Sequence, residues 1–159
     1  MSHDEVEILY VEDNAADIEL TLVALRRSRL ANRIHIARDG VEALDFLFCR
    51  GPYMDRKFLA PKLVLLDMKL PRLDGLEVLQ AIRGEERTAM IPVVMLTSSN
   101  EQADMVESYK LHVNSYIQKP VDFDRFQQVV QQLGLYWLVV NQFAPINGSE
   151  VMQAEKRGV

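Results

Sequence analysis

This sequence contains a single cysteine, Cys49, among 159 residues. One cysteine cannot form a disulfide bond within the chain, whereas small secreted domains are usually held together by paired cysteines. No run approaches the roughly 20 apolar residues that a membrane-spanning helix needs. The polar N-terminus also lacks the basic and apolar regions of a secretory signal peptide. We therefore expect a cytoplasmic protein with no membrane contact.

The chain also contains fewer basic than acidic residues. The chain has 18 Lys and Arg residues against 23 Asp and Glu residues, for a formal net charge of -5. Proteins that bind the phosphate backbone of nucleic acids concentrate Lys and Arg, so we expect no nucleic-acid partner. The composition, 48% hydrophobic and 26% charged, is typical of a soluble globular protein. A chain of this length forms one domain that buries roughly 70% of its unfolded surface.

Five short apolar segments alternate with stretches of helical spacing. The predicted strands are Val6–Val11, Ile34–Ala37, Leu63–Leu66, Pro92–Leu96 and Ser115–Gln118. Between the first two strands, Ile18, Leu22 and Leu25 recur at the spacing of one helical face. Strands separated by helices pair in parallel through right-handed crossovers. The pattern therefore predicts an α/β fold in which a doubly wound, five-stranded parallel sheet lies between two layers of helices.

Polar side chains follow the predicted strands at the point where each strand ends. Glu12 and Asp13 come after the first strand, Asp67 after the third, Thr97 after the fourth and Lys119 after the fifth. Doubly wound sheets bind ligands beyond the carboxyl ends of their strands, so we expect these side chains to meet at one edge. Three crowded carboxylates favour a hard divalent cation such as Mg²⁺. A phosphoryl group on Asp67 would then lie between the cation, the Lys119 ammonium and the Thr97 hydroxyl, which suits phosphoryl transfer.

Four motifs resemble those of response-regulator receiver domains, the phosphorylation modules of two-component signalling. They are ILYVEDN (Ile8–Asn14), LVLLDMKLPRLDG (Leu63–Gly75), VVMLTSS (Val93–Ser99) and YIQKP (Tyr116–Pro120). The resemblance covers residues from about 6 to 132 of the chain. It implies a flavodoxin-like (βα)5 fold with strand order 2-1-3-4-5.

The resemblance also implies a role for each acidic residue. Asp67 would be the phosphoacceptor, which receives the phosphoryl group from a phosphohistidine of a sensor histidine kinase. Asp13 and Asp67 would bind Mg²⁺ directly, with the backbone carbonyl of Lys69 as a third ligand, and Glu12 would act through a metal-bound water. Such a protein catalyses only its own phosphorylation and dephosphorylation, so we do not expect a metabolic enzyme.

The remaining motif residues are implied to bind the phosphoryl group and to respond to it. Thr97 and Lys119 would hold phosphoryl oxygens. Tyr116 would be the aromatic switch, which moves inward as Thr97 approaches the phosphate. Pro120 would follow a cis peptide bond, which is essentially a proline feature. Ser98 would flank the path of the hydrolytic water and so influence the lifetime of the phosphorylated form.

Two other families place chemistry at the same positions of a similar fold. A flavodoxin needs a phosphate-binding loop rich in hydroxyls and glycine after the first strand, where Glu12 and Asp13 would repel a phosphate. A haloacid-dehalogenase-type phosphatase uses a second Asp two residues after its nucleophile, where this chain has Lys69. Both families therefore fit the sequence less well than the receiver family.

The segment after the predicted core is unusually apolar. Eight of the 11 residues from Leu133 to Phe143 are apolar, too many for one face of a solvent-exposed helix. We expect an extended last helix that reaches residue 143, with a possible kink or break at Gly134, because glycine costs about 1 kcal/mol inside a helix. Exposed apolar patches usually mark association. We therefore expect a homodimer interface, with folding back onto the same domain as the alternative, at Tyr136, Trp137, Val139, Val140 and Phe143.

Residues 144–159 are predicted to be a flexible polar tail, so we expect one receiver domain, residues 1–143, without an output domain. The apolar last segment and the long insert Gly51–Pro61 resemble the stand-alone regulators that partner bacterial and cyanobacterial phytochrome kinases, often as homodimers. The predicted function is phosphorylation-dependent signalling with a sensor histidine kinase as the partner, and the resemblance to these regulators implies a bacteriophytochrome as that kinase. A phosphorelay intermediate that serves a histidine phosphotransferase and a phosphorylation-independent adaptor are the alternatives.

Overall fold

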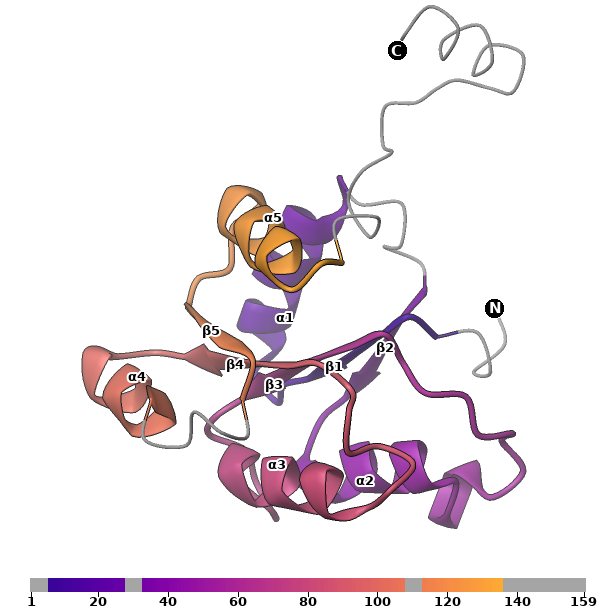
Figure 1. Ribbon diagram of the computed structural model, residues 1–159. Helices are drawn as coiled ribbons and strands as arrows, with labels where there is room; N and C mark the ends of the chain where they lie inside the picture. Colours follow the sequence, from indigo (N-terminus) through magenta and orange to yellow (C-terminus); the bar gives the residue numbers. More distant parts are fainter. Residues whose placement is uncertain (1–5, 28–32, 108–112, 136–159) are drawn as a thin grey trace, which may run out of the picture.

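A computed structural model describes residues 6–27, 33–107 and 113–135 of the chain, in which strands and helices alternate (Figure 1). The strands are β1 (Ile8–Val11), β2 (Ile34–Ala37), β3 (Leu63–Asp67), β4 (Val93–Thr97) and β5 (Ser115–Gln118). The helices are α1 (Ala15–Leu25), α2 (Gly40–Phe48), the 3₁₀ turn η3 (Gly51–Tyr53), α3 (Gly75–Gly84), α4 (Asn100–Glu107) and α5 (Phe123–Gln132). Within the described ranges, none of the helices is both long enough and apolar enough to span a lipid bilayer.

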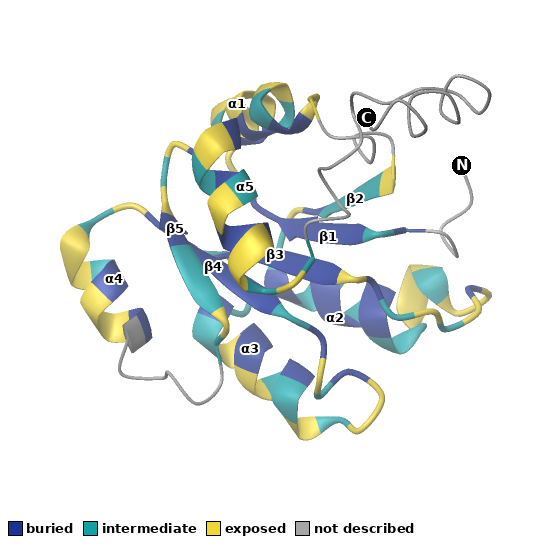
Figure 2. Ribbon diagram, turned by 45° about the horizontal axis from the view of Figure 1, so that its top comes forward, coloured by how far each residue is buried: buried dark blue, intermediate teal, exposed yellow. Residues whose placement is uncertain are grey.

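The five strands form one parallel sheet in the order β2-β1-β3-β4-β5, which confirms the predicted topology. β1 lies between β2 and β3, and its Ile8 is in register with Ile34 on one side and Leu63 on the other. Helices α1 and α5 cover one face of the sheet, and α2 and α3 cover the other (Figure 1). Strands covered on both faces are buried along their length, and every residue of β1, β3 and β4 is buried (Figure 2).

Two hydrophobic clusters hold the layers together, because alternate residues of a strand face opposite sides of the sheet. One cluster joins the sheet to α2 and α3 and includes Leu9, Val64, Phe46, Leu79 and Ile82. The other joins the sheet to α1 and α5 and includes Tyr10, Leu65, Ile18, Phe126 and Val130. The strands are thus fixed on both sides, and so are the positions of their carboxyl ends.

Side-chain caps determine where several helices begin. The first turns of four helices donate a backbone N–H to the side chain of Asn14, Asp39, Asp74 or Asp122. Asp74 forms a complete capping box with Glu77. A cap of this kind contributes about 1 kcal/mol. Asn14 and Asp74 therefore start α1 and α3 directly after the loops that follow β1 and β3.

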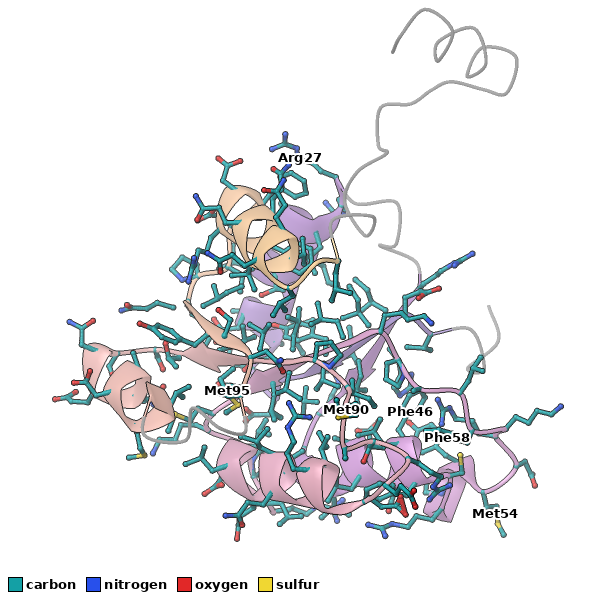
Figure 3. All side chains as sticks on the ribbon, viewed as in Figure 1. Arg27, Phe46, Met54, Phe58, Met90 and Met95 are labelled. Carbon is teal, nitrogen blue, oxygen red and sulfur yellow. The ribbon has the colours of Figure 1, made fainter. Side chains whose placement is uncertain are left out.

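The long insert between α2 and β3 is tied to the domain by Arg56. Its guanidinium donates hydrogen bonds to the backbone carbonyls of Phe46 at 2.8 Å and Leu59 at 2.9 Å, and it lies 3.9 Å from the centre of the Phe46 ring. Phe46 also stacks on the ring of His35 in β2, with 4.1 Å between the ring centres. Phe46 lies near the sheet, whereas Met54 lies at the outer rim of the insert (Figure 3). The insert is therefore packed onto α2.

Helix α5 ends at Gln132, earlier than the extended last helix that we expected. Gly134 has a φ of 75°, a left-handed conformation that glycine adopts readily. The N–H groups of Gly134 and Leu135 donate to the carbonyls of Gln131 and Val130 at 3.0 and 2.7 Å, a pattern that closes helix ends. The break raised for Gly134 is therefore present, and the predicted extension to residue 143 lies outside the described part of the chain. The residues of the predicted dimer interface lie outside the described part of the chain: Tyr136, Trp137, Val139, Val140 and Phe143.

Candidate functional site

The carboxylates that were expected at one edge of the sheet do lie together there. Glu12 and Asp13 follow β1, Asp67 is the last residue of β3, and β1 and β3 are neighbours. Carboxylate oxygens of the three residues lie within 4.8 Å of one another. The Glu12 side chain is fully buried and Asp67 is 3% exposed, whereas Asp13 is exposed. Carboxylates this close repel one another unless a cation or a proton offsets their charge.

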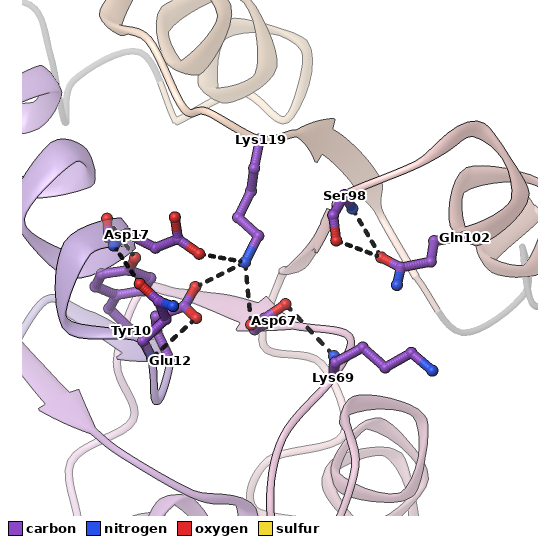
Figure 4. A network of polar contacts seen from close by, with 9 residues as sticks. Tyr10, Glu12, Asp17, Asp67, Lys69, Ser98, Gln102 and Lys119 are labelled. Carbon is purple, nitrogen blue, oxygen red and sulfur yellow. Dashed lines mark hydrogen bonds and ion pairs between the residues drawn. The ribbon is translucent and has the colours of Figure 1, made fainter.

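Lys119, which follows β5, brings a positive charge to these carboxylates (Figure 4). Its Nζ lies 3.2 Å from Glu12 Oε1, 3.2 Å from Asp67 Oδ2 and 2.9 Å from Asp17 Oδ2. The Lys119 side chain is 12% exposed, so water screens these ion pairs less than it screens surface pairs. The peptide bond between Lys119 and Pro120 is cis, which is the geometry that the resemblance implied.

Asp17 was not part of the predicted site, although it makes the shortest of these three contacts. It lies in the first turn of α1, where its backbone N–H donates to the Asn14 side chain at 2.9 Å. Its backbone carbonyl accepts a hydrogen bond from the Tyr10 hydroxyl at 3.4 Å. The sequence signal that could have found it is its position three residues after the N-cap, because the first turn of a helix stays close to the strand end that precedes it.

Burial and mutual repulsion change the acid–base properties of the site. Burial is the largest cause that raises the pKa of Glu12 to about 8, the hydrogen bond and charge of Asp67 raise it further, and Lys119 opposes the change. Burial alone would lower the pKa of Lys119, but the hydrogen bond to Asp17 and the charges of Asp67 and Glu12 raise it above its ordinary value. Lys119 is therefore a permanent cation within a cluster that holds excess negative charge.

Thr97 lies at the end of β4, which neighbours β3, and Tyr116 lies on β5, the next strand of the sheet. The Thr97 hydroxyl is buried, and its Oγ1 has no hydrogen-bond partner among the residues that the structure describes. An unpaired buried polar group costs about 1–3 kcal/mol. The Thr97 carbonyl accepts a hydrogen bond from the Lys119 N–H at 2.7 Å, which joins β4 to the segment after β5. Tyr116 is half-buried and packs against the core cluster on the α3 side.

The loop after Asp67 folds tightly back onto the end of β3. The Gly75 N–H donates to the Met68 carbonyl at 3.0 Å, and a Cβ atom at position 75 would lie 2.4 Å from the Asp67 carbonyl oxygen. The close approach requires a residue without a side chain. The Lys69 N–H lies 3.4 Å from Asp67 Oδ1, to which it donates. The loop that contains the predicted metal ligand Lys69 is therefore held next to the Asp67 carboxylate.

The donor set fits a hard divalent cation. Glu12, Asp13 and Asp67 offer carboxylate oxygens, which Mg²⁺ and Mn²⁺ prefer to nitrogen or sulfur. Asp13 is exposed, so the site is open on one side to the waters that such ions retain. An oxygen nucleophile beside a cation site, an ammonium group and a hydroxyl is the arrangement that phosphoryl transfer requires.

The fold and the site define the class of protein. A model of the response regulator receiver domain matches residues 8–131. The chain therefore belongs to the response-regulator receiver family, the phosphorylation-based modules of two-component signalling. It is 42% identical over 141 residues to the probable methanogenesis regulatory protein FilR2 of Methanothrix harundinacea, with 89% of each chain covered. It is 40% identical over 131 residues to the response regulator Rcp1 of Synechocystis, with 82% of this chain and 88% of Rcp1 covered.

Solved structures of phytochrome response regulators are similar to this chain. The bacteriophytochrome response regulator AtBRR has a TM-score of 0.77 and 50% identity, over 90% of this chain and 99% of AtBRR. The Mn²⁺-bound form of Rcp1 has a TM-score of 0.66 and 38% identity, over 87% of this chain and 98% of Rcp1. Together with the cluster of Glu12, Asp13 and Asp67, the metal-bound relative indicates a divalent-metal site in this chain.

Proposed function

We propose that this chain accepts a phosphoryl group on the Asp67 carboxylate from the phosphohistidine of a sensor histidine kinase, in a Mg²⁺-dependent reaction in the cytoplasm. One cluster of side chains carries the proposal. Asp67 lies 3.2 Å from the Lys119 ammonium and shares the sheet edge with Glu12 and Asp13. The neighbouring strand ends in Thr97, whose buried hydroxyl lacks a partner among the described residues. The role of the chain is then to carry a signal rather than to turn over a metabolite.

The reaction follows from this arrangement. A carboxylate oxygen of Asp67 attacks phosphorus, the O–P bond forms, and the bond from phosphorus to the histidine nitrogen breaks with its electron pair left on the imidazole. Positioning and charge neutralisation account for most of the catalysis in such transfers. After transfer, the Lys119 ammonium would form an ion pair with one phosphoryl oxygen. The Thr97 hydroxyl would donate a hydrogen bond to a second phosphoryl oxygen.

The carboxylates beside Asp67 support a metal ion. Mg²⁺, when bound, neutralises part of the negative charge on the phosphoryl oxygens. Asp13 and Asp67 would be direct ligands, and the Lys69 carbonyl would be the third protein ligand because its loop lies against Asp67. The fully buried Glu12 would hold a metal-bound water and keep its contact with Lys119.

Thr97 and Tyr116 would form the conformational switch. Tyr116 on β5 is in register with Met95, which lies two residues before Thr97 on β4. Residues in register, and residues two apart on a strand, point to the same face of a sheet. The Thr97 and Tyr116 side chains therefore share one face, where a movement of Thr97 toward a phosphoryl group would make room for the Tyr116 ring.

The partner would be a kinase of the phytochrome type. Support comes from the similarity to the bacteriophytochrome response regulator AtBRR. The surface of α1 also offers a contact region, because its Leu20 and Val23 side chains are 54% and 53% exposed. The same helix carries Asp17, which contacts Lys119. A kinase that docks on α1 would bring its phosphohistidine close to Asp67.

We also propose that the chain forms a homodimer through residues 136–143. An open groove of about 490 Å³ at the amino ends of β3 and β4 is lined largely by apolar side chains, among them Pro61, Met90, Pro92 and Leu135. Met90 is 89% exposed. Leu135 lines this groove and immediately precedes the predicted interface in the sequence, so we expect the groove to adjoin the interface.

Intact-mass spectrometry with acetyl phosphate as a small phosphodonor tests the proposed chemistry. A phosphoryl adduct is expected on the wild type with Mg²⁺, and none is expected with EDTA or on the Asp67→Asn variant. An adduct that persists in Asp67→Asn would contradict the assignment of the acceptor. If acetyl phosphate gives no adduct on the wild type, a phosphotransfer assay with a sensor kinase decides between the alternatives. Transfer of the phosphoryl group to the wild type would support the proposal, and no transfer would favour a phosphorylation-independent adaptor.

A further inference from the structure

The side chain of Gln102 holds the residue that follows Thr97. Gln102 lies in the first turn of α4, and its Oε1 accepts hydrogen bonds from the Ser98 N–H at 2.7 Å and the Ser98 hydroxyl at 3.2 Å (Figure 4). The Gln102 N–H in turn donates to the Ser99 hydroxyl oxygen at 3.1 Å. One glutamine therefore ties the loop after β4 to the beginning of α4.

The direction of the Ser98 N–H follows from the peptide bond that it shares with Thr97. The Thr97 carbonyl points toward the β5 side of β4, because it accepts a hydrogen bond from the Lys119 N–H at 2.7 Å. In a trans peptide the N–H points opposite to the carbonyl, so the Ser98 N–H points toward the β3 side. β3 ends in Asp67, and its successor Met68 donates to the Leu96 carbonyl of β4 at 3.1 Å. The Ser98 N–H is thus directed to the side of β4 on which the acceptor carboxylate lies.

We propose that Gln102 is a positioning residue that competes with the phosphoryl group for the Ser98 N–H. The inference rests on the proposed phosphorylation of Asp67. In the unphosphorylated protein the Gln102 carboxamide oxygen accepts this hydrogen bond at 2.7 Å. In the phosphorylated protein a phosphoryl oxygen on Asp67 accepts it instead, and the Gln102 side chain is released. No covalent bond changes in the exchange, and a neutral acceptor is replaced by a charged one, which forms the stronger hydrogen bond.

The exchange would link the phosphoryl group to α4. Release of Gln102 removes the side-chain contacts that join Ser98 to the first turn of the helix. The contact with Gln102 must break before Ser98 can bind the phosphoryl group, so it stabilises the unphosphorylated state. A typical hydrogen bond contributes about 1 kcal/mol net, which corresponds to about a fivefold bias in an equilibrium.

Three variants of the full chain test this competition. Gln102→Met keeps the length of the side chain and removes the acceptor, whereas Gln102→Glu keeps an acceptor oxygen at the same distance from the backbone. Gln128→Met is the control, because it makes the same change as the first variant at an exposed position of α5, an element that does not contain Ser98 or Gln102. Beryllofluoride, a tetrahedral mimic of a phosphoryl group on a carboxylate, is titrated with Mg²⁺ present, and exchange of the Ser98 amide proton with water is followed by NMR.

Without beryllofluoride, Ser98 exchange should be about fivefold faster in Gln102→Met than in the wild type. Exchange should be slow in Gln102→Glu and Gln128→Met. With beryllofluoride, the Ser98 amide should be protected in every variant, and Gln102→Met should bind the mimic about fivefold more tightly than wild type. Unchanged exchange in Gln102→Met, or an affinity within about twofold of the wild type, would overturn the role of Gln102.

The proposed function fails in a different way. If the wild type does not bind beryllofluoride with Mg²⁺, or if Asp67→Asn binds it equally well, Asp67 is not the acceptor and both proposals are wrong. If the wild type binds beryllofluoride through Asp67 and the Ser98 amide stays unprotected in the complex, only the competition by Gln102 is wrong.

Discussion

The ammonium group of Lys119 contacts three carboxylates, and these contacts differ in what they contribute. Asp67 is the proposed nucleophile, whereas Asp17 contacts the Lys119 ammonium from the first turn of α1 at 2.9 Å. Asp17→Asn should therefore slow phosphorylation by acetyl phosphate by less than about tenfold, because Lys119 keeps its contacts with Glu12 and Asp67 and the Asp17 pair is partly exposed to solvent. The rate of adduct formation followed by intact mass is the measurement. A complete loss of the adduct, as expected for Asp67→Asn, would give Asp17 a more direct role.

Glu12 should make the stability of the metal-free protein depend on pH. Its pKa is raised from 4.5 to about 8, so between these values the folded protein holds a proton that the unfolded chain releases. The stabilising effect is complete at low pH and is lost as pH rises through the folded pKa. In EDTA, the free energy of unfolding should fall between about pH 5 and about pH 8, by at most about 1.4 kcal/mol per pH unit for one proton.

Denaturant titrations across this pH range, with Glu12→Gln as the comparison, check the prediction. The variant lacks the titrating carboxyl, so its stability should depend less on pH than that of the wild type. Parallel curves for the two proteins would mean that Glu12 is not the group responsible.

The residues of the site that directly follow strands could be predicted, because parallel strands bring their carboxyl ends to one edge whatever the details of packing. Asp67 and Lys119 were predicted in this way, and they form an ion pair at 3.2 Å. Asp17 and Gln102 were missed because they lie in the first turns of helices and not at strand ends. Whether a side chain on a helix reaches back to the site depends on the angle at which the helix leaves the strand, and a sequence pattern does not specify this angle.

At the scale of elements, two glycines at helix ends should respond differently to alanine. Gly134 has a φ of 75°, and a Cβ there would have no atom within 4 Å. Gly134→Ala should therefore destabilise the fold by about 1 kcal/mol through backbone strain alone. Gly84, the last residue of α3, also has open space around its Cβ position but no positive φ. Gly84→Ala should be neutral or stabilise the protein by up to about 1 kcal/mol.

Thermal or denaturant unfolding of the two alanine variants gives the comparison directly. If both variants lose the same stability, the left-handed conformation of Gly134 does not determine where α5 ends. The sequence indicated a break at this glycine but did not distinguish a kinked helix from a terminated one, since both have the same local pattern.

Helix α1 should determine how well a kinase recognises the chain. Leu20→Asp and Val23→Asp place charges on its exposed apolar surface and should slow phosphotransfer from the cognate kinase by about tenfold or more. Phosphorylation by acetyl phosphate should remain unchanged, because neither side chain belongs to the site. Met54→Asp, at a 71% exposed position in the insert, is the matched control and should leave both reactions unchanged. Equal rates of kinase transfer in all three variants would exclude α1 as the docking surface.

At the scale of the whole molecule, the proposed dimer gives the clearest prediction. Tyr136→Asp or Val140→Asp would bury an unpaired charge, which is strongly destabilising in an interface, and should convert dimers to monomers. Met90→Asp should weaken the dimer as well if the groove that it lines belongs to the interface. Sedimentation equilibrium at several concentrations measures the change. A wild type that sediments as a monomer would contradict the proposal.

The overall topology was predictable because it depends on hydrophobic patterning and on general rules of connection between strands. The buried run of β3 and its central place in the sheet follow from a continuous apolar sequence. The sequence alone does not decide between a dimer and a monomer, because a segment as apolar as residues 133–143 fits both an interface and a helix folded back on its own domain. Composition indicates that such an apolar surface must be buried. Which segment or second molecule buries it depends on contacts that form after folding.

The central claim is that Asp67 is the residue that receives the phosphoryl group. Borohydride reduces an acyl phosphate to an alcohol, so a phosphorylated aspartate becomes homoserine, which tandem mass spectrometry can place in the sequence. After phosphorylation by acetyl phosphate or a sensor kinase with Mg²⁺, we expect homoserine at position 67 and at no other acidic residue. Homoserine at another acidic position of the cluster, such as Asp13, with Asp67 unmodified, would contradict the claim.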